Sequence, residues 1–559
     1  MGLQLRAEQS SVVKIFSSEA EFEIPDFQRP YSWEYSQCFQ LYSDIFEMYY
    51  LGEEFFLGNI ITAKSKDNDD ILQIVDGQQR LTTLLLWIRA LDLLYKEEFE
   101  STHGGLYKAL YKEDWETSEF KTRLKSNIFE TDDDKNLQPI LSKDFVVNAL
   151  LNKCFKDNKI DEKECSSKFE RNFLYFYIWT KKDFKKDIKE FITYLLKSVM
   201  LLPIELEANT TEEAVGKALR IFETINNRGM DLEDSDIFKS KLHILASKQG
   251  EKDIFIDRWV ELRESVESLG LKIDDIFRYY SHLIRAKEKI VSSEINLREF
   301  FTLKPYSPLK RSDSNYNEIL DELYKIIEIY RFIDDVIASK NQLSKWFGLI
   351  NIYTNQYPKI ALIIYLYKLS QDGINLEGLQ NEKVGQAKID AIITFCKSLI
   401  RYIYYMGATA TIKFEIYTII RDVIWNQEIK DYCRDVKAGE FDRLGRLKNG
   451  YALLGYYLQN EKTVINPKVD RVITYKDQQE IDYRQIENVY DRLGNFFIIE
   501  SKKRINKKYL DKISRYNNES TIFSNQIDIK KIEINPIDTI MSRDEELKEL
   551  IAQFIKGLI

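Results

Sequence analysis

The chain has 559 residues, and at roughly 100–200 residues per domain this length predicts several domains. Lys and Arg number 81 and Asp and Glu number 90, so the net charge of −9 excludes a uniformly basic nucleic-acid coat. Hydrophobic residues make up 44%, with only 21 Gly and 9 Pro, which excludes fibrous, collagen-like and largely disordered chains. We expect a globular, helix-rich protein.

The cysteines indicate a reducing compartment. The five cysteines are widely spaced and form no close pair of the kind that a zinc site or a disulfide framework needs. The first residues contain no apolar signal core, and no stretch reaches the ~18 apolar residues that cross a bilayer. We therefore expect a cytoplasmic protein with no membrane partner.

The N-terminal part mixes strand and helix signals. Alternating apolar and polar residues at 21–24 predict a short strand. After the cap candidate Ser32, apolar residues recur near helical spacing over the next four turns. Apolar runs at 55–62 and 71–75 predict buried strands, and a long apolar helix follows at 81–95.

Residues 96–200 are charged and helical in character. Their acidic stretch at 130–134 and their Lys-rich stretch at 181–189 are each interpreted as a solvated face or loop. An apolar run at 201–206 predicts another strand, which is followed by a helix beginning near Thr211.

The second half of the chain is dominated by helix signals. From about 250 to 430 the sequence is almost entirely helical, and apolar residues between 319 and 337 step by four and three, as on the buried face of an amphipathic helix. Alternation at 469–512 suggests strands with a helix. The expected fold class is α+β and helix-rich, with a central all-helical domain and a small α+β C-terminal domain. The expected domains are 1–250, 251–435 and 436–559.

The first functional signal is the segment IVDGQQRLTT at residues 74–83. The chain has neither a G-x-x-x-x-G-K-[ST] loop nor a G-x-G-x-x-G after a strand, which excludes P-loop and ordinary Rossmann sites. Here a buried strand delivers Asp76 to a turn opened by Gly77. The helix that follows points its free N–H groups and its positive dipole end at whatever lies above that turn.

Such a turn suits a phosphate. Arg80, on the first helical turn, can grip phosphate oxygens bidentately, and Asp76 can hold Mg²⁺ or orient a water. The alternative interpretation is structural: Asp76 caps the helix and pairs with Arg80.

Two further clusters contain the same residue types. Residues 24–33 place Gln28 and Arg29 among aromatic rings, which could stack a base and hold phosphate or could equally be core. Asn226 and Arg228 lie in a third Asn- and Arg-rich loop between two predicted helices. Packing alone does not readily explain three such loops.

The chain resembles the N-terminal domain of the GmrSD-type, type IV restriction family through four segments in order: IPDFQRPYSW, FFLGNIIT, IVDGQQRLTTL and FETINNRGMDLEDSDIFKSK. These are bacterial phage-defence proteins that act on modified DNA. The resemblance implies a ParB and sulfiredoxin type of fold and a DGQQR motif that binds and hydrolyses a nucleoside triphosphate with Mg²⁺. By resemblance the catalytic residues are Asp76, Gln79 and Arg80. The implied nucleotide-binding residues are Gln28, Arg29, Gly77, Gln78, Asn226 and Arg228.

The same family carries an HNH-type nuclease domain, which residues 469–514 resemble in part. Gly494 and Asn495 match its Gly-Asn strand, but Arg471 stands where a His is expected, and no His follows His282. A guanidinium can neither act as general base nor bind a metal. We expect a degenerate nuclease, and the sequence identifies no metal ligands.

A basic run on this acidic chain is a candidate DNA contact. It begins at residue 502 and faces a single acid, Asp511, before residue 515. Its members could contact the phosphate backbone or simply form a solvated surface run. The candidate DNA-binding residues are Lys502, Lys503, Arg504, Lys507 and Lys508.

Taken together, the sequence predicts a nucleotide-hydrolysing sensor or regulatory subunit of a phage-defence restriction system that acts on foreign or modified DNA. The alternatives are a non-hydrolysing module that binds DNA or a phage protein, and an active nuclease with a non-standard site. Expected partners are DNA and either a separate nuclease subunit or a phage component. The nucleotide base, the trigger and a homo-oligomeric state are left open.

Overall fold

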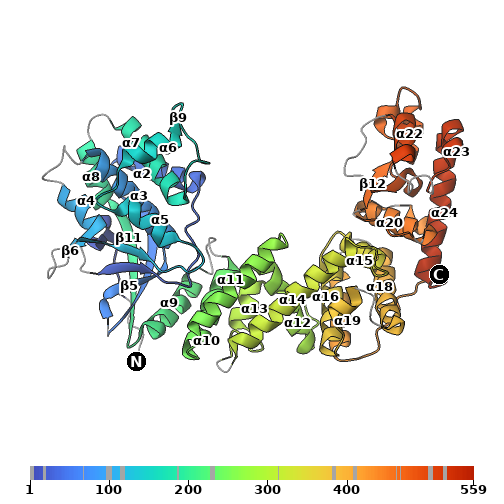
Figure 1. Cartoon of the computed structure of the whole chain (residues 1–559), viewed down its shortest axis with the longest axis horizontal. Helices are drawn as coiled ribbons and strands as arrows, with labels where there is room; N and C mark the ends of the chain where they lie inside the picture. The colour runs from blue at the N-terminus through green and yellow to red at the C-terminus, as the bar shows by residue number, and fades with distance from the viewer. Residues whose placement is uncertain are drawn as a thin grey trace. The chain divides into compact units, whose positions relative to one another are not determined.

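The structure is a computed structural model. It describes residues 6–16, 20–66, 68–95, 103–113, 120–184, 188–226, 233–311, 314–380, 385–406, 412–442, 444–460, 462–465, 467–500, 508–519 and 526–559. The chain divides into two compact units, Met1–Val260 and Glu261–Ile559 (Figure 1). Each unit is described by itself.

A mixed sheet forms the frame of the first unit. Within the described residues it has seven strands in the order β1-β11-β4-β5-β3-β8, with β2 also paired to β11. Strands β4 and β5 form an antiparallel hairpin, whereas β4–β11, β5–β3 and β3–β8 are parallel. The strands are β1 (Arg6–Ala7), β2 (Ser10–Ser11), β3 (Glu21–Ile24), β4 (Phe55–Ser65), β5 (Asn68–Asp76), β8 (Leu124–Ser126) and β11 (Val199–Ala208).

Helices cover both faces of this sheet. Successive residues of β4 alternate between two hydrophobic clusters, because side chains of a strand point to opposite faces: Ile60 packs with α3 (Gln78–Tyr95), and Ile61 packs with α9 (Thr211–Asn226). On the first face Trp87 is fully buried, stacks on Phe176 of α7 (Lys168–Asp183) at 5.1 Å, and donates to Thr180. The long helix α3 is therefore a rigid core element.

Most predicted elements of the first unit are confirmed. The strands expected at 21–24, 55–62, 71–75 and 201–206 are β3, β4, β5 and β11, and the helix expected at 81–95 is the greater part of α3. The fold class, α+β and rich in helix, is also confirmed. The strands β1, β2 and β8 were not predicted, because two or three residues carry no periodicity.

Two local expectations are wrong. Helix α2 (Tyr35–Leu51) begins after the cap residue Glu34, so Ser32 does not cap it. The acidic stretch at 130–134 is solvated only in part. Asp132 is 67% exposed, but the side chain of Glu130 is 7% exposed and pairs with Lys239, and Asp133 is buried and accepts from the Tyr31 N–H at 2.8 Å. Acids inside a domain are tolerated where donors reach them.

In its described residues, the second unit consists of helices and loops with one small two-stranded sheet. Helix α14 (Tyr316–Ile337) buries the predicted stripe, so that expectation is confirmed. It packs with α12 (Ile273–Lys287), α16 (Tyr357–Gln371) and α15 (Ser344–Asn351). Helices α18 (Gln386–Met406) and α24 (Pro536–Lys556) also pack together within this unit, where the Arg401 Nε donates to the Phe554 carbonyl at 2.9 Å. The expected boundary at 435/436 stays a prediction.

The strands predicted after residue 469 are present. β12 (Lys468–Arg471) pairs antiparallel with β13 (Phe496–Ile499), and α22 (Tyr509–Glu519) packs on this pair through Tyr516, whose ring lies 5.4 Å from that of Phe497. Helix α21 (Tyr483–Val489) lies between the strands in the sequence. Within the described residues, none of the helices is both long and apolar enough to span a membrane.

Candidate functional site

The loop between β3 and α2 is held against the DGQQR segment by side-chain amides. Gln28 donates to the Val75 carbonyl at 3.0 Å, which ties the loop to the end of β5. Gln78 donates to the Gln28 side-chain oxygen at 3.2 Å and to the Arg29 carbonyl at 3.1 Å. Both glutamines are buried. The structure thus joins two of the predicted motifs directly.

Gln79 is a second clamp on the same loop. Its Nε2 donates to the Pro30 carbonyl at 3.1 Å, and its Oε1 accepts from the Ser32 N–H at 2.8 Å. The side chain is 7% exposed. Both ends of the amide are therefore hydrogen-bonded to the backbone of the loop, so Gln79 positions this loop on α3.

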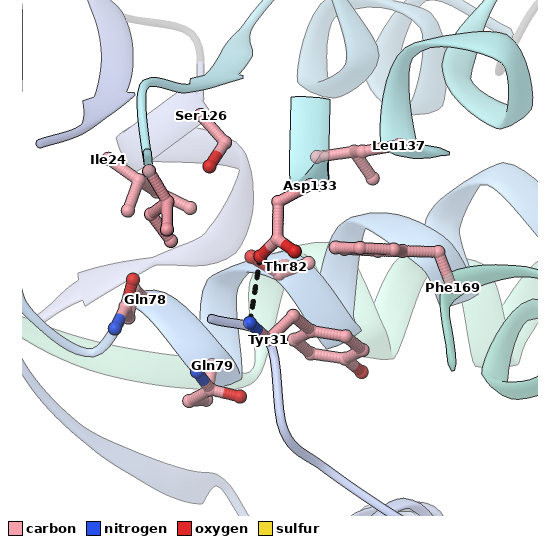
Figure 2. Close-up of a pocket in the computed structure, with 10 residues that line it drawn as sticks. Ile24, Tyr31, Gln78, Gln79, Thr82, Ser126, Asp133, Leu137 and Phe169 are labelled. Carbon is pink, nitrogen blue, oxygen red and sulfur yellow. Dashed lines mark hydrogen bonds between the residues drawn. The ribbon is translucent and has the colours of Figure 1, made fainter. Parts of the chain in front are cut away.

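A small cavity lies beside these glutamines. Figure 2 shows Gln78 and Gln79, from the first turn of α3, among the residues that line it, together with Tyr31, Ser126 and Asp133. Its volume of about 10 Å³ is room for one water, and the buried Ser126 hydroxyl, which lacks a protein partner, is a suitable ligand for that water. Burial raises the pKa of Asp133. A nucleotide does not fit in this space.

The charged groups of the motif lie on the turn that follows β5. β5 ends at Asp76, Gly77 has a φ of +90°, and α3 begins at Gln78. A Cβ at residue 77 would lie 3.2 Å from the Asn59 carbonyl, so both conformation and space favour glycine there. The turn predicted from the sequence is present.

Asp76 and Arg80 face each other across this turn. The closest atoms of their ion pair are 3.6 Å apart, and the side chains are 16% and 26% exposed. Arg80 also donates to the Leu57 carbonyl at 3.2 Å. The sequence had suggested, as an alternative to phosphate binding, that Asp76 pairs with Arg80, and this pairing is observed. It leaves both side chains partly exposed to solvent beside the positive end of α3.

Helix α10 (Asp234–Lys248) holds the other side of the loop. Lys239 is 2% exposed, donates to the Gln28 carbonyl at 3.1 Å and pairs with Glu130. His243 lies 3.2 Å from Asp26, which also pairs with Lys252 of α11 (Lys252–Ser268). These contacts were not predicted, because nothing in the local sequence shows which distant helix meets the loop.

Two carboxyl groups on this side have shifted pKa values. Burial alone would raise the pKa of Asp26, but hydrogen bonds and charge from His243 and Lys252 lower it to about 2. Burial raises the pKa of Asp236 to about 6, although the positive charges of Arg29 and Lys239 offset part of the effect. One Asp236 oxygen is buried without a hydrogen-bond partner.

Residues 12–243 match the family described as GmrSD restriction endonuclease, N-terminal domain. This segment is a GmrSD N-terminal domain. It contains all four motifs on which the resemblance depends, and it indicates a role in a phage-defence restriction system and interaction with DNA. A search of curated proteins found no match to the chain.

Part of the fourth motif of the GmrSD N-terminal domain lies outside the described residues. Asn226 is the last residue of α9, and nothing is described of its side chain or of Arg228. What the structure does bring together is the loop at 25–32, the DGQQR turn and α10, all within the matched domain.

The HNH-like segment of the second unit is built around Asn495. This fully buried side chain accepts from the Ile473 N–H at 2.8 Å and donates to the carbonyls of Ile473 and Tyr490. Gly494 is required because a side chain there would collide with the backbone of α24 at Ile540. Both residues are thus explained by packing.

Two basic side chains of this segment, Arg471 and Lys512, are hydrogen-bonded to its backbone. Arg471 donates to the Tyr490 carbonyl at 3.0 Å and pairs with Asp491 at 2.8 Å. Lys512 is 2% exposed, donates to the Arg471 carbonyl at 2.6 Å, and has a pKa lowered by burial. Within the part of the chain that is described, no cluster of three or more His, Cys, Asp or Glu side chains could hold a metal ion.

The candidate DNA-binding run is described only at its end. Lys502, Lys503, Arg504 and Lys507 lie outside the described residues. Lys508 is 42% exposed and pairs with Glu480 at 2.8 Å.

Proposed function

We propose that the GmrSD N-terminal domain binds a nucleoside triphosphate with Mg²⁺ at the turn after β5 and hydrolyses it. The chain would then be a nucleotide-hydrolysing sensor or regulatory subunit of a restriction system. The observation that carries this proposal is that Asp76 and Arg80 keep partly exposed charges at the N-terminus of α3, whereas the motif's glutamines are buried.

The chemistry follows from this division of roles. The N–H groups of the first α3 turn and the Arg80 guanidinium would bind phosphate oxygens. Asp76 is a partly exposed carboxylate, and Mg²⁺ commonly uses one or two carboxylates together with substrate phosphates, so the residues present fit the ion. Bound Mg²⁺ would neutralise phosphate charge. Gln28, Gln78 and Gln79 would position the loop that flanks the turn.

The direct experiment is phosphate release from the four common nucleoside triphosphates by the purified full chain, with and without Mg²⁺. Release with at least one nucleotide, dependent on Mg²⁺, is expected. Absence of release with all four would remove hydrolysis from the proposal.

One observation favours the second candidate, a nucleotide-binding module without hydrolysis. Both ends of the Gln79 amide are engaged by Pro30 and Ser32, so this side chain orients a water only if those bonds break. If nucleotides raise the thermal midpoint of the chain without releasing phosphate, this second function is the correct one.

For the C-terminal region we infer a degenerate nuclease. Arg471 stands where the resemblance expects a His, and it is held by the Tyr490 carbonyl and cannot act as a base. Cleavage in this restriction system would come from a separate nuclease subunit, with DNA or a phage component as trigger in the cytoplasm. The third candidate, an active nuclease with a non-standard site, has no described metal-ligand cluster in its favour.

A further inference from the structure

A group of basic and aromatic side chains lies within the helical part of the second unit. Three basic residues of α12 are four and three positions apart, so they share one face of that helix. Two tyrosines join them from α16 and from α19 (Ile412–Ile424), because these three helices pack together. We call these side chains the α12 cluster: Arg278, His282, Arg285, Tyr357 and Tyr417.

A carboxylate from a neighbouring loop is bound in the α12 cluster. Glu294 accepts from the Arg278 Nε at 2.9 Å and Nη2 at 3.3 Å, and from the Tyr357 hydroxyl at 2.7 Å. The His282 Nε2 lies 3.3 Å from the same carboxylate. Burial alone would raise the pKa of Glu294, but hydrogen bonds from His282 and Arg278 lower it. The cluster therefore recognises an oxyanion, with the guanidinium fork on both oxygens.

The loop that carries this carboxylate joins α12 to α13 (Leu297–Leu303) and lies at the surface. We call residues 289–296 the strap. Arg285 donates to the carbonyls of Ser292 and Ser293, and both serines are exposed. The strap thus supplies acceptors to two arginines of the cluster from the solvent side, as a bound ligand would.

The strap satisfies the cluster only in part. Arg278 and Arg285 share the carboxylate of Glu294, which leaves positive charge in excess, and burial lowers the pKa of His282. The His282 Nδ1 and the Arg285 Nε are buried without a hydrogen-bond partner, although their side chains are 0% and 2% exposed. Both side chains lie against the Tyr417 ring, at 5.6 Å and 4.7 Å from its centre. Buried polar atoms without partners indicate a missing ligand or water.

We propose that the α12 cluster binds a phosphate monoester, which takes the place of Glu294 and opens the strap. A phosphate carries a charge of about −1.5 to −2 and three acceptor oxygens, whereas Glu294 offers one charge and two oxygens. It can therefore match two arginines and also reach polar atoms that the carboxylate leaves open. Access is available, since the side chains of Arg278 and Glu294 are 31% and 22% exposed. The proposal concerns the second unit and does not depend on nucleotide hydrolysis by the first.

The test is calorimetric titration of the full chain with inorganic phosphate. Arg80→Ala, which removes the arginine of the DGQQR turn, should leave this binding in place, whereas Arg278→Ala should weaken it at least about tenfold through loss of charged hydrogen bonds. Glu294→Gln should bind at least about tenfold more tightly, because the apparent affinity rises with the fraction of open strap. A gain of affinity cannot result from misfolding.

Matched controls remove the same charges from an exposed ion pair nearby. Arg311 lies 3.5 Å from Glu288, and both side chains are at least 43% exposed. Arg311→Ala and Glu288→Gln should bind phosphate like the wild type. Adenosine monophosphate and a 5′-phosphorylated oligothymidylate, each compared with its unphosphorylated form, show whether a free nucleotide or a DNA end supplies the phosphate.

Hydrogen exchange of the strap amides gives a second readout. Phosphate should speed exchange at residues 289–296 in the wild type, and Glu294→Gln should exchange faster there even without phosphate. Four results would each overturn the proposal: no phosphate binding by the wild type, unchanged binding by Arg278→Ala, no gain in Glu294→Gln, or unchanged strap exchange at saturating phosphate.

Discussion

The guanidinium of Arg80 fills the space that a side chain at residue 58 would need. Gly58 lies in β4 with a φ of +119°, and a Cβ built on it would overlap the Arg80 Nη1. The same nitrogen donates to the Leu57 carbonyl at 3.2 Å. The glycine of the FFLGNIIT segment thus fixes where the DGQQR arginine lies.

Gly58→Ala is therefore expected to displace Arg80. The methyl group would push the guanidinium off Leu57, and the positive φ adds strain, so we expect a loss of at least about 1 kcal/mol in unfolding free energy. Phosphate release, if present in the wild type, should fall as in Arg80→Ala. Urea unfolding and release assays measure both effects. Gly348→Ala, in α15 with open space around the Cβ, is the control and should be neutral or slightly stabilising.

The Gln79 clamp predicts a stability effect. Gln79→Ala leaves the Ser32 N–H and the Pro30 carbonyl without their partner, which costs about 2 kcal/mol for buried groups. Gln79→Glu can still accept from Ser32 but cannot donate to Pro30, so it should also destabilise. Urea unfolding checks this, with the exposed Gln40→Ala as control within about 0.5 kcal/mol. Wild-type stability of both Gln79 variants would contradict the positioning role.

Replacing the buried Asp236 is expected to raise the stability of the chain in a pH-dependent way. Its pKa rises from an ordinary 3.8 to about 6 in the folded chain, so ionising this carboxyl group destabilises the fold. The destabilisation is absent below pH 3.8 and reaches its full size above pH 6. Asp236→Asn should therefore raise the unfolding free energy at pH 7, by up to about 3 kcal/mol, and make no difference near pH 4.

Unfolding curves at pH 4, 5.5 and 7 measure this difference. Asp435→Asn replaces an acid that is 99% exposed and should show no such trend. A destabilised Asp236→Asn at pH 7 would show that the carboxylate has a partner when the chain is folded.

We expect that the chain does not cleave DNA through its second unit. The purified chain should not cut plasmid or phage DNA with Mg²⁺ or Mn²⁺, because Arg471 cannot act as a base and no His follows His282. Asn495→Ala should lower stability by a few kcal/mol through its lost backbone bonds, whereas the exposed Asn488→Ala should not. Metal-dependent nicking that Asn495→Ala abolishes would restore the nuclease function.

Periodicity and turn chemistry were sufficient to predict much of the frame from the sequence. The strand ending at Asp76, the turn at Gly77 and the helix that follows are local features, and each is present. The stripe on α14 is likewise a local pattern. These signals depend only on neighbours in the chain.

The interior of the candidate site was not predictable in the same way. The sequence cannot show that Gln78 and Gln79 turn inward to hold residues 28–32, because an amide that contacts a ligand and one that contacts backbone look alike. Glu130 was interpreted as solvated because its buried partner, Lys239, lies more than a hundred residues away. Long-range pairing of polar groups decides these positions.

The most direct test of the central claim is phosphate release by Asp76→Ala and Arg80→Ala. Both side chains are partly exposed and their ion pair is loose, so neither change should cost more than about 1 kcal/mol of stability. Lys368→Ala and Asp372→Ala break an ion pair of the same spacing at the C-terminal end of α16 and serve as controls. We predict at least a tenfold loss of release in both site variants and none in the controls. Release at the wild-type rate by both site variants would contradict the proposed site.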